Sequence, residues 1–385
     1  MSHASPVFYI NHLRNYNDLS TETTSDYVNL SAPQFHKNIK GYKPTPLVEL
    51  PELAASIGVD KIFIKDESKR FHLKAFKCLG ASFGIHSVIG NKGGSEFDLI
   101  CSATDGNHGR AVAWFARQIQ KKCVILVPIG TTQQRIEAIR SEGAEVIIVK
   151  GDYDTTVERA FQYSIENNGL LVQDTAFDNY ELIPQLIMQG YTTMMEEIRE
   201  ELEIKGWKNS FDLVLIQSGN GTWGAAVASY LHSESNNSIP QIISVEPFES
   251  DCCFSAVSSG KIIQTQKSQK TMMAGLNCGT ISKLAFPIYK SVFSGMLLLK
   301  EEHTINAMRL FASPLKSDAA IESGESGAAG LAGLMALTKD KSYADLKEYL
   351  GIGKRSRVLI FNTEGITDQS NYDKIVKRQL NFFRD

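Results

Sequence analysis

Short apolar runs recur along the chain, each followed by a glycine or polar turn and then by a segment of helical periodicity. Most runs are rich in β-branched residues and unbroken, which is typical of strands buried on both faces. The predicted strands span residues 61–65, 99–102, 123–127, 146–149, 213–217, 242–246, 296–299 and 358–361, with helices such as 109–118, 154–167, 190–203 and 328–337 between them. This alternation predicts an α/β protein with mainly parallel sheets.

The predicted strands fall into two groups along the chain. The block from about residue 99 to 172 looks self-contained, and the strands after residue 211 form a second group. The segment before Lys77 fits either group. A length of 385 residues is enough for two or three domains. A groove between two such units is the expected place for a small ligand.

Composition and charge exclude several classes of function. The chain is 43% apolar and 22% charged with a net charge of −3, which is ordinary for a globular protein. No long basic run indicates a nucleic-acid or membrane partner, and no apolar run approaches the ~20 residues that span a bilayer. Residues 1–13 show no secretory signal. Six scattered cysteines, without metal-type spacing, predict free thiols in a reducing cytoplasm and no metal site.

The segment 65–80 places a lysine where a strand gives way to a helix. The strand ends near Lys65, and helical character begins around Lys77, directly after Phe76. A charged lysine at a helix N-terminus opposes the macrodipole, so we expect Lys77 to lose its proton easily, as suits an amine that attacks an aldehyde. The spacing alone also fits a solvated lysine beside Lys69 and Lys74.

Two polar loops follow predicted strands and open predicted helices. The first, at 102–111, brings Asp105, Asn107 and His108 to a strand end, where α/β sheets bind ligands. It equally fits a tight turn in which Asp105 or Asn107 caps the helix. The second, Gly-Asn-Gly-Thr-Trp-Gly at 219–224, offers backbone N–H groups to an anion. It also matches the dinucleotide pattern GxGxxG, with Glu246 where a ribose-binding acid would lie.

Two other strand ends carry polar side chains. Asp174 follows a candidate strand and either reaches the same cleft or is a turn residue. Asn362 or Thr363, after the last strand, offers a neutral hydrogen bond to a ligand.

Taken together, these stretches resemble the diaminopropionate ammonia-lyases, within the tryptophan synthase β-like class of pyridoxal-phosphate enzymes. The resemblance runs from residue 43 to the end of the chain. The aspartate before Gly-Asn-His-Gly and the stretch Ala-Gly-Leu-Asn-Cys-Gly separate this family from the serine and threonine dehydratases. The matching stretches are KPTPL at 43–47, AFKCLG at 75–80, TDGNHGR at 104–110, PQLIMQGY at 184–191, VEP at 245–247, AGLNCG at 274–279, ESG at 322–324 and TEG at 363–365.

The resemblance implies a fold, an activity and a cofactor. The fold would be two three-layer αβα domains: a large cofactor-binding domain of residues 1–88 and 188–385, and a small domain of residues 89–187 that closes over the site. The activity would be pyridoxal 5'-phosphate-dependent α,β-elimination of 2,3-diaminopropionate to pyruvate and two ammonia. The enzyme would be a homodimer.

The resemblance also implies a role for each motif residue. Asp105 and Asp174 would be the acid/base carboxylates that face the substrate, with Asp105 assisting departure of the β-amine, a step that general acid–base catalysis typically accelerates ~10²–10⁴-fold. The cofactor would be held by Lys77 (covalently), Phe76 (against the ring), Asn107 (at the phenolic oxygen), Gly219, Asn220, Gly221 and Thr222 (at the phosphate), and Thr363 or, less favoured, Asn362 (at the pyridine nitrogen).

Some positions depart from the usual pattern of the family and bear on substrate range. They are His72, Lys74, Asn220, Trp223 and Ile366, of which Trp223 could narrow the pocket. Three alternatives remain open from the sequence: a serine or threonine dehydratase on the same scaffold, an NAD-dependent dehydrogenase that uses the 219–224 loop, and a non-catalytic binding protein.

Overall fold

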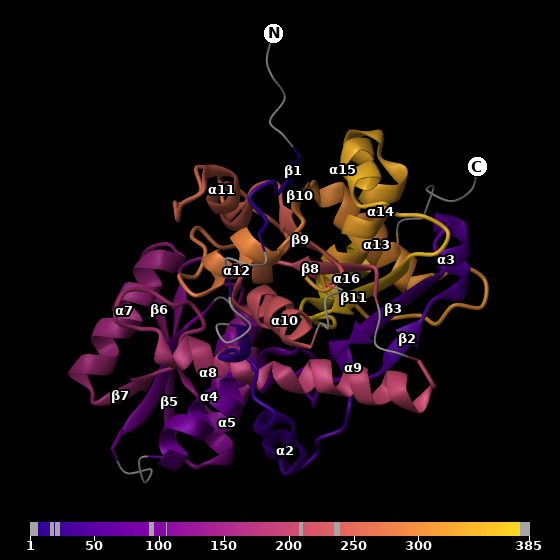
Figure 1. Cartoon of the computed structure of the whole chain (residues 1–385). Helices are drawn as coiled ribbons and strands as arrows, with labels where there is room; N and C mark the ends of the chain where they lie inside the picture. The colour runs from indigo at the N-terminus through magenta and orange to yellow at the C-terminus, as the bar shows by residue number, and fades with distance from the viewer. Residues whose placement is uncertain are drawn as a thin grey trace.

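The computed structural model describes residues 7–15, 19, 24–91, 96–104, 106–207, 211–234 and 239–377. It contains two sheets, which lie side by side in Figure 1. The seven-stranded sheet has the order β1 (Phe8–Ile10), β10 (Gly295–Leu299), β9 (Gln241–Pro247), β8 (Leu213–Gln217), β11 (Arg357–Asn362), β3 (Lys61–Asp66) and β2 (Leu47–Glu49). The four-stranded sheet has the order β6 (Glu145–Val149), β5 (Lys122–Pro128), β4 (Leu99–Ala103) and β7 (Gly169–Leu171).

The sheets are mainly parallel, as the sequence predicts. All pairs in the four-stranded sheet are parallel, and so are the pairs from β10 to β3 in the large sheet. Only the three-residue edge strands β1 and β2 pair antiparallel. The segment before Lys77 fitted either group of strands, and the structure assigns its strands β2 and β3 to the large sheet.

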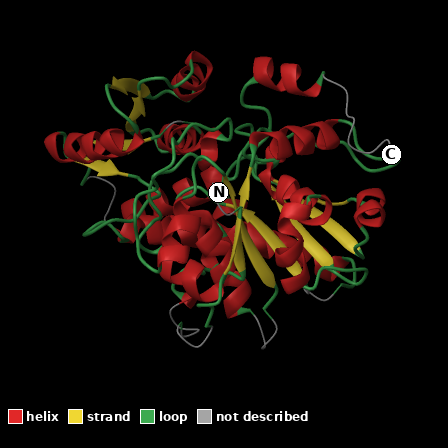
Figure 2. Ribbon diagram, turned by 90° about the horizontal axis from the view of Figure 1, so that it is seen from above, coloured by secondary structure: helices red, strands yellow, loops and turns green. Residues whose placement is uncertain are grey.

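Helices cover the sheets on both sides (Figure 2). The α-helices are α2 (Ser31–Lys37), α3 (Pro51–Ile57), α4 (Lys77–Asn91), α5 (Asn107–Gln118), α6 (Gln133–Ser141), α7 (Tyr153–Glu166), α8 (Leu182–Gly190), α9 (Thr192–Ile204), α10 (Thr222–Ser233), α11 (Cys252–Ser259), α12 (Ala285–Val292), α13 (Glu301–Ala312), α14 (Ala329–Lys339), α15 (Ala344–Tyr349) and α16 (Gln369–Val376). The helix predicted at 190–203 is α9, which begins at Thr192, whereas Gly190 ends the separate helix α8.

The alternating side chains of β8 show how the large sheet is covered. Leu213 and Leu215 belong to the core shared with α14, whereas Val214 and Ile216 belong to the core shared with α10. Successive strand residues point to opposite faces, so β8 is buried by a helix layer on each side. This three-layer packing explains why its sequence is an unbroken apolar run.

Glycines let α4 and α8 approach closely, and α4 begins with Lys77. A Cβ atom on Gly190 would lie 2.5 Å from the Leu79 carbonyl oxygen, and one on Gly80 would lie 2.7 Å from the side chains of Ile187 and Tyr191. Both separations are shorter than side chains allow, so the two helices meet backbone to backbone. This contact fixes the position of the helix that carries the lysine.

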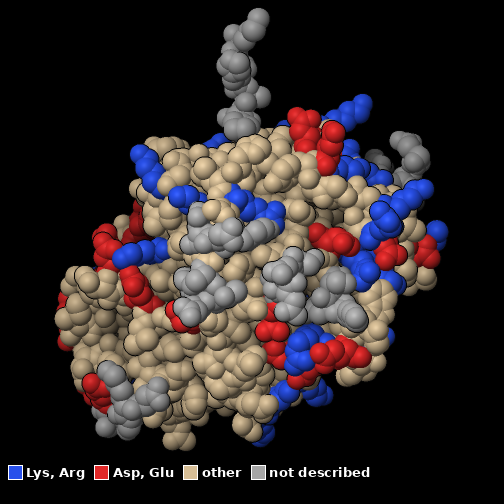
Figure 3. All heavy atoms as spheres, in the orientation of Figure 1, with Lys and Arg blue, Asp and Glu red and all other residues tan. Residues whose placement is uncertain are grey.

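The surface carries charges of both signs. Lysine and arginine side chains alternate with aspartate and glutamate across the face in Figure 3. Within the described part of the chain, no helix has the length and apolar character needed to cross a membrane. The six cysteines are free thiols, and five of them are buried.

Candidate active site

A cavity lies where strand ends of both sheets meet the start of α4. It encloses about 770 Å³, including open solvent at its mouth. Ligand sites commonly have ~300–1,000 Å³ and lie beyond the carboxyl ends of parallel strands. Eight predicted site residues line the cavity: Phe76, Lys77, Asn107, Asp174, Gly219, Asn220, Gly221 and Thr363. Of the other two, Thr222 lies next to it and donates its hydroxyl to the Asp174 carbonyl oxygen, and Asp105 falls outside the described residues.

Lys77 and Asp174 form an ion pair in this cavity. The Lys77 Nζ lies 2.6 Å from Asp174 Oδ2, and both side chains are largely buried. Burial acts to lower the pKa of Lys77, but the negative charge of Asp174, its hydrogen bond and the charges of Tyr191 and Cys278 together outweigh burial, so the Lys77 pKa lies above its ordinary value. Burial acts in the opposite sense on Asp174, yet the charge of Lys77 holds the Asp174 pKa well below its usual range.

The prediction that Lys77 loses its proton easily is therefore wrong for the structure described. That prediction rested on the helix dipole, which is worth under about 2 kcal/mol even in favourable geometry. A carboxylate in direct contact and shielded from water has the larger effect. Lys77 instead has a carboxylate partner, Asp174, which stabilises the protonated form of its amine.

His108 adds a third titratable group beside this pair. Its Nε2 lies 2.8 Å from the Val172 carbonyl oxygen, so Nε2 carries the proton, and its Nδ1 lies 3.8 Å from Asp174 Oδ2. Burial lowers the pKa of His108, with the Lys77 charge acting in the same direction and Asp174 against it. A neutral His108 thus presents an unprotonated nitrogen to the Lys77–Asp174 pair.

The glycine loop has the form of an anion cup. Gly221 precedes α10 with a φ of +83°, a backbone conformation that favours glycine, and it supplies no side-chain cap to the helix. A Cβ atom on Gly219 would lie 3.0 Å from Cys278 Sγ, which is tighter than most Cβ contacts, so the wall there favours glycine. The start of α10 therefore faces the cavity with its backbone N–H groups, a favourable site for a phosphate.

Asn220 ties this loop to Asp174. Its side-chain nitrogen donates to Asp174 Oδ1 at 3.0 Å and to the Thr175 hydroxyl at 2.7 Å, and its oxygen accepts from the Thr222 N–H. The asparagine that departs from the family pattern is thus a structural link between the loop and the ion pair.

Glu246 does not serve the loop as a ribose-binding acid. Its two oxygens each accept a backbone N–H, from Cys253 and Phe254, at 2.8 Å, and the residue is fully buried. Because the carboxylate caps α11, it offers nothing to a nucleotide sugar. The interpretation of the loop as a dinucleotide site is wrong for this reason.

An apolar wall stands beside Lys77. The ring centroid of Phe76 lies 5.1 Å from that of Tyr191 and 5.1 Å from that of Trp223, and Trp223 in turn meets Phe361 edge-on. Trp223 is only 5% exposed and lines the cavity.

Asn107 is held by a residue that the sequence analysis did not single out. Its side-chain nitrogen donates to Glu364 Oε2, and Glu364 Oε1 accepts the Ser326 N–H at 3.1 Å. Asn107 therefore does not act as the cap of α5, whose N-cap is Gly106. Burial raises the pKa of Glu364, and the charge of Glu325 adds to this. The only signal in the sequence was the position of Glu364 inside the Thr-Glu-Gly motif.

Thr363 and Asn362 lie on opposite sides of the strand end. Thr363 lines the cavity and accepts a hydrogen bond from Gln217 Nε2 at 3.2 Å. Asn362 points away from the cavity, where its side-chain nitrogen donates to Asp66 and to the Glu322 carbonyl oxygen at 2.8 Å. Of the two residues considered for the pyridine nitrogen, Thr363 is among the described residues that line the cavity and Asn362 is not.

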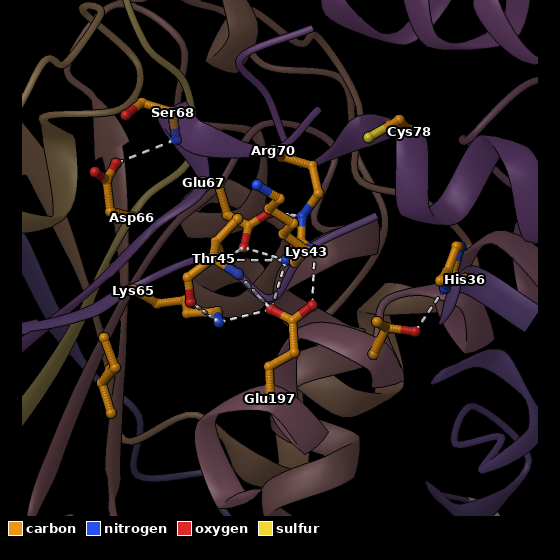
Figure 4. A network of polar contacts seen from close by, with 12 residues as sticks. His36, Lys43, Thr45, Lys65, Asp66, Glu67, Ser68, Arg70, Cys78 and Glu197 are labelled. Atoms are coloured by element: carbon orange, nitrogen blue, oxygen red, sulfur yellow. Dashed lines mark hydrogen bonds and ion pairs between the residues drawn. The ribbon is translucent and has the colours of Figure 1, made fainter. Parts of the chain in front are cut away.

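A buried ionic network fixes the segment that leads to Lys77 (Figure 4). Glu197 on α9 lies 2.7 Å from Lys65 at the end of β3 and 2.7 Å from Arg70. Arg70 also lies 2.7 Å from Glu67, and Thr45 donates its hydroxyl to Glu67. Two cations and two anions thus compensate one another without solvent, and together they join β3, α9 and the turn before the lysine.

The cavity fits pyridoxal 5'-phosphate on its own geometry. It holds an amine, an N-terminal anion cup and an aromatic wall within one enclosure. Four of its lining residues also carry buried polar atoms that lack a hydrogen-bond partner among the described residues, so the enclosure is suited to a polar ligand. These atoms are His108 Nδ1, Gln217 Oε1, Trp223 Nε1 and Asn277 Oδ1.

Comparison with known proteins agrees with this geometry. The family model described as pyridoxal-phosphate dependent enzyme matches residues 39–352. A diaminopropionate ammonia-lyase of Escherichia coli K12 is 37% identical over 360 residues, which cover 90% of each chain. The crystal structure of holo diaminopropionate ammonia lyase from Escherichia coli superposes with a TM-score of 0.88 at 35% identity, covering 96% of each chain.

The dehydratases are more distant relatives. An L-threonine dehydratase of Haemophilus influenzae is 26% identical over 288 residues, which cover 74% of this chain and 52% of that protein. The cavity, its lysine and these similarities lead to one assignment: the chain is a pyridoxal-phosphate dependent enzyme and belongs to the family of the diaminopropionate ammonia-lyases.

Proposed function

We propose that this chain eliminates ammonia from 2,3-diaminopropionate and releases pyruvate and a second ammonia. The observation that carries the proposal is the buried Lys77–Asp174 pair beside the glycine cup. A lysine with a carboxylate partner can both hold a cofactor aldehyde and move a proton at the substrate.

We assign the cofactor contacts by position in the cavity. Lys77 would hold pyridoxal 5'-phosphate covalently, and Phe76 would pack against its ring. The phosphate would lie at the N–H groups of Gly219, Asn220, Gly221 and Thr222, with Thr363 at the pyridine nitrogen and Asn107 at the phenolic oxygen. When bound, this cofactor supplies an electron sink for the charge left at Cα.

The proton transfers are the work of the protein's own side chains. Once substrate has displaced it, Lys77 Nζ would remove the α proton, and Asp174 would keep that proton close by. A β-amine leaves only as ammonia, so a carboxylic acid must supply it with a proton or keep it protonated. Asp105 is our candidate for that step, on the strength of its place in the Thr-Asp-Gly-Asn-His motif.

We also propose a domain division, an oligomeric state and a cellular location for the protein. We propose that residues 89–187, which include the four-stranded sheet, form a small domain that closes over the site on the large domain of residues 1–88 and 188–385. We further propose a homodimer that works in the cytoplasm, in keeping with the free cysteines.

The test compares wild-type protein with the Lys77→Ala variant. Wild-type protein loaded with pyridoxal phosphate should show a visible absorption band that borohydride abolishes, and it should form pyruvate from diaminopropionate faster than it forms pyruvate from serine or 2-oxobutyrate from threonine. The Lys77→Ala variant should lose the borohydride-sensitive band and the turnover. Faster pyruvate formation from serine would instead make the chain a dehydratase, and bound cofactor without any turnover would make it a binding protein.

A further inference from the structure

A second cavity adjoins the first and is rich in basic side chains. It is lined by His72, Lys74, Arg110 and Arg135, which we call the basic vestibule. The two cavities share three lining residues, Asn107, Gly275 and Glu364, so the vestibule opens beside the site that contains Lys77.

Among the described residues, the basic side chains of the vestibule outnumber the acids that pair with them. The buried Glu142 is shared by Arg110 at 3.1 Å, His72 at 3.1 Å and Arg117 at 2.8 Å. In the part of the chain that the structure describes, Lys74 pairs with the half-exposed Glu322 at 3.9 Å, which it shares with Lys69. An exposed pair at that distance is weak.

Arg135 is the basic residue of the vestibule whose charge is least balanced by ion pairs among the described residues. Its side chain lies along Gly106, about 4 Å from the position of a Cβ atom there, and makes no ion pair with the described residues. Glu364 is the acid that faces it, but the two oxygens of Glu364 already accept from Asn107 and Ser326. Among the described residues, the Arg135 guanidinium thus has no ion-pair partner that would compete with a ligand.

The backbone of Lys74 adopts a conformation that residues with a side chain disfavour. Its φ of +58° lies in the left-handed region, which costs a residue with a side chain roughly 1 kcal/mol and which asparagine tolerates better. Its carbonyl oxygen accepts the Gly365 N–H at 2.8 Å, so the backbone conformation is fixed by the Thr-Glu-Gly loop. A lysine at this position brings an ammonium group to the vestibule.

We propose that the basic vestibule binds the carboxylate of the incoming amino acid, with Arg135 as the main contact, before the amino acid reaches Lys77. This inference rests on the proposed function for the identity of the ligand. A guanidinium binds a carboxylate through two parallel hydrogen bonds, and neighbouring cations raise the local concentration of an anionic group.

The experiment uses the cofactor-loaded protein and two matched substitutions on α6. Arg135→Gln should raise KM for diaminopropionate about tenfold and leave kcat within about twofold, because the contact is made before chemistry. Arg140→Gln removes the same charge from an exposed position of the same helix and should leave KM unchanged. Arg135→Lys should recover part of the loss, since it restores the charge but not the paired hydrogen bonds.

A direct binding measurement separates this inference from the proposed function. Malonate, a dicarboxylate without an amine, is titrated calorimetrically into the loaded wild-type protein and both variants. Weaker binding to Arg135→Gln alone supports the vestibule even if diaminopropionate is not turned over. Equal malonate binding in wild type and Arg135→Gln, or equal KM changes in the two glutamine variants, overturns it.

Discussion

At the scale of single residues, the proposed chemistry depends on the pairing of Lys77 with Asp174. The two are 97 positions apart in the sequence, and the fold brings them to 2.6 Å. The sequence motifs identified both residues as candidates, but local sequence could not predict that the two side chains are in contact. The direction of the Lys77 pKa was wrongly predicted for the same reason, because the carboxylate that raises it comes from a distant strand end.

Replacing Asp174 with asparagine tests this pair. The change keeps the size of the side chain and removes the charge that raises the pKa of Lys77, so that pKa falls and the limb of the pH–rate profile governed by Lys77 moves to lower pH. We expect kcat to drop by about 10²–10⁴-fold, the usual worth of acid–base assistance.

The control for this variant is Asp178→Asn, at an exposed aspartate that pairs with Lys283 at 3.0 Å. It should leave both the rate and the profile as in wild type. An Asp174→Asn enzyme with wild-type kcat would show that the carboxylate takes no part in proton transfer.

At the scale of elements, long strands were predictable and short ones were not. Each predicted strand corresponds to a strand of the structure, because an unbroken apolar run is the signature of a strand buried on both faces. The edge strands β1 and β2 have three residues each, too few for a pattern to develop. The sequence analysis missed α8 as a separate element, because the predicted helix 190–203 began at Gly190, which is the last residue of α8.

The buried network between β3 and α9 gives a prediction at this scale. Glu197→Gln leaves Lys65 and Arg70 with excess positive charge in a site without solvent, which typically costs about 3–5 kcal/mol. We expect that loss in the free energy of unfolding measured with urea.

Glu200→Gln is the matched control on the same helix. Glu200 pairs with Lys37 at 3.1 Å with both side chains about 40% exposed, and such a pair is worth under ~1 kcal/mol. Similar losses in the two variants would mean that the buried network contributes no more than a surface pair.

At the scale of the whole molecule, the site belongs to both sheets. Lys77, the glycine loop and Thr363 are positioned by strands of the large sheet, whereas Asn107 and Asp174 follow strands of the four-stranded sheet. The sequence analysis predicted a groove between two units from the grouping of strands, and the lining residues agree with it. It could not predict Glu364 or Arg135, because their roles arise from the packing of one loop against another.

The stability of the whole chain should depend on pH through His36. This histidine is fully buried, with Nε2 3.0 Å from the Leu79 carbonyl oxygen and Nδ1 2.6 Å from the Thr193 hydroxyl. Burial, helped by the charge of Arg70, lowers the pKa of His36 to about 3. In the unfolded chain, His36 therefore takes up a proton near pH 6.5, whereas in the folded chain it stays neutral at that pH.

The contribution of His36 is complete above pH 6.5 and is lost as the pH falls toward 3. Protonation of His36 in the unfolded chain should lower the free energy of unfolding by about 2 kcal/mol when the pH falls from 7 to 5. The His36→Asn variant should lack this part of the pH dependence, while replacement of the exposed His12 by glutamine should retain it. Identical pH slopes for wild type and His36→Asn would refute the assignment.

The pairing of β3 with β11 also sets the order in which the enzyme can mature. Asn362 at the end of β11 bonds to Asp66 at the end of β3, 296 positions earlier, and β11 is the parallel neighbour of β3 in the sheet. A ribosome synthesises the chain from its N-terminus, so β3 lacks its neighbour β11 in the sheet until residues 357–362 have been synthesised. We therefore expect cofactor binding to follow the synthesis of β11, because Thr363, which lines the cavity, comes directly after that strand.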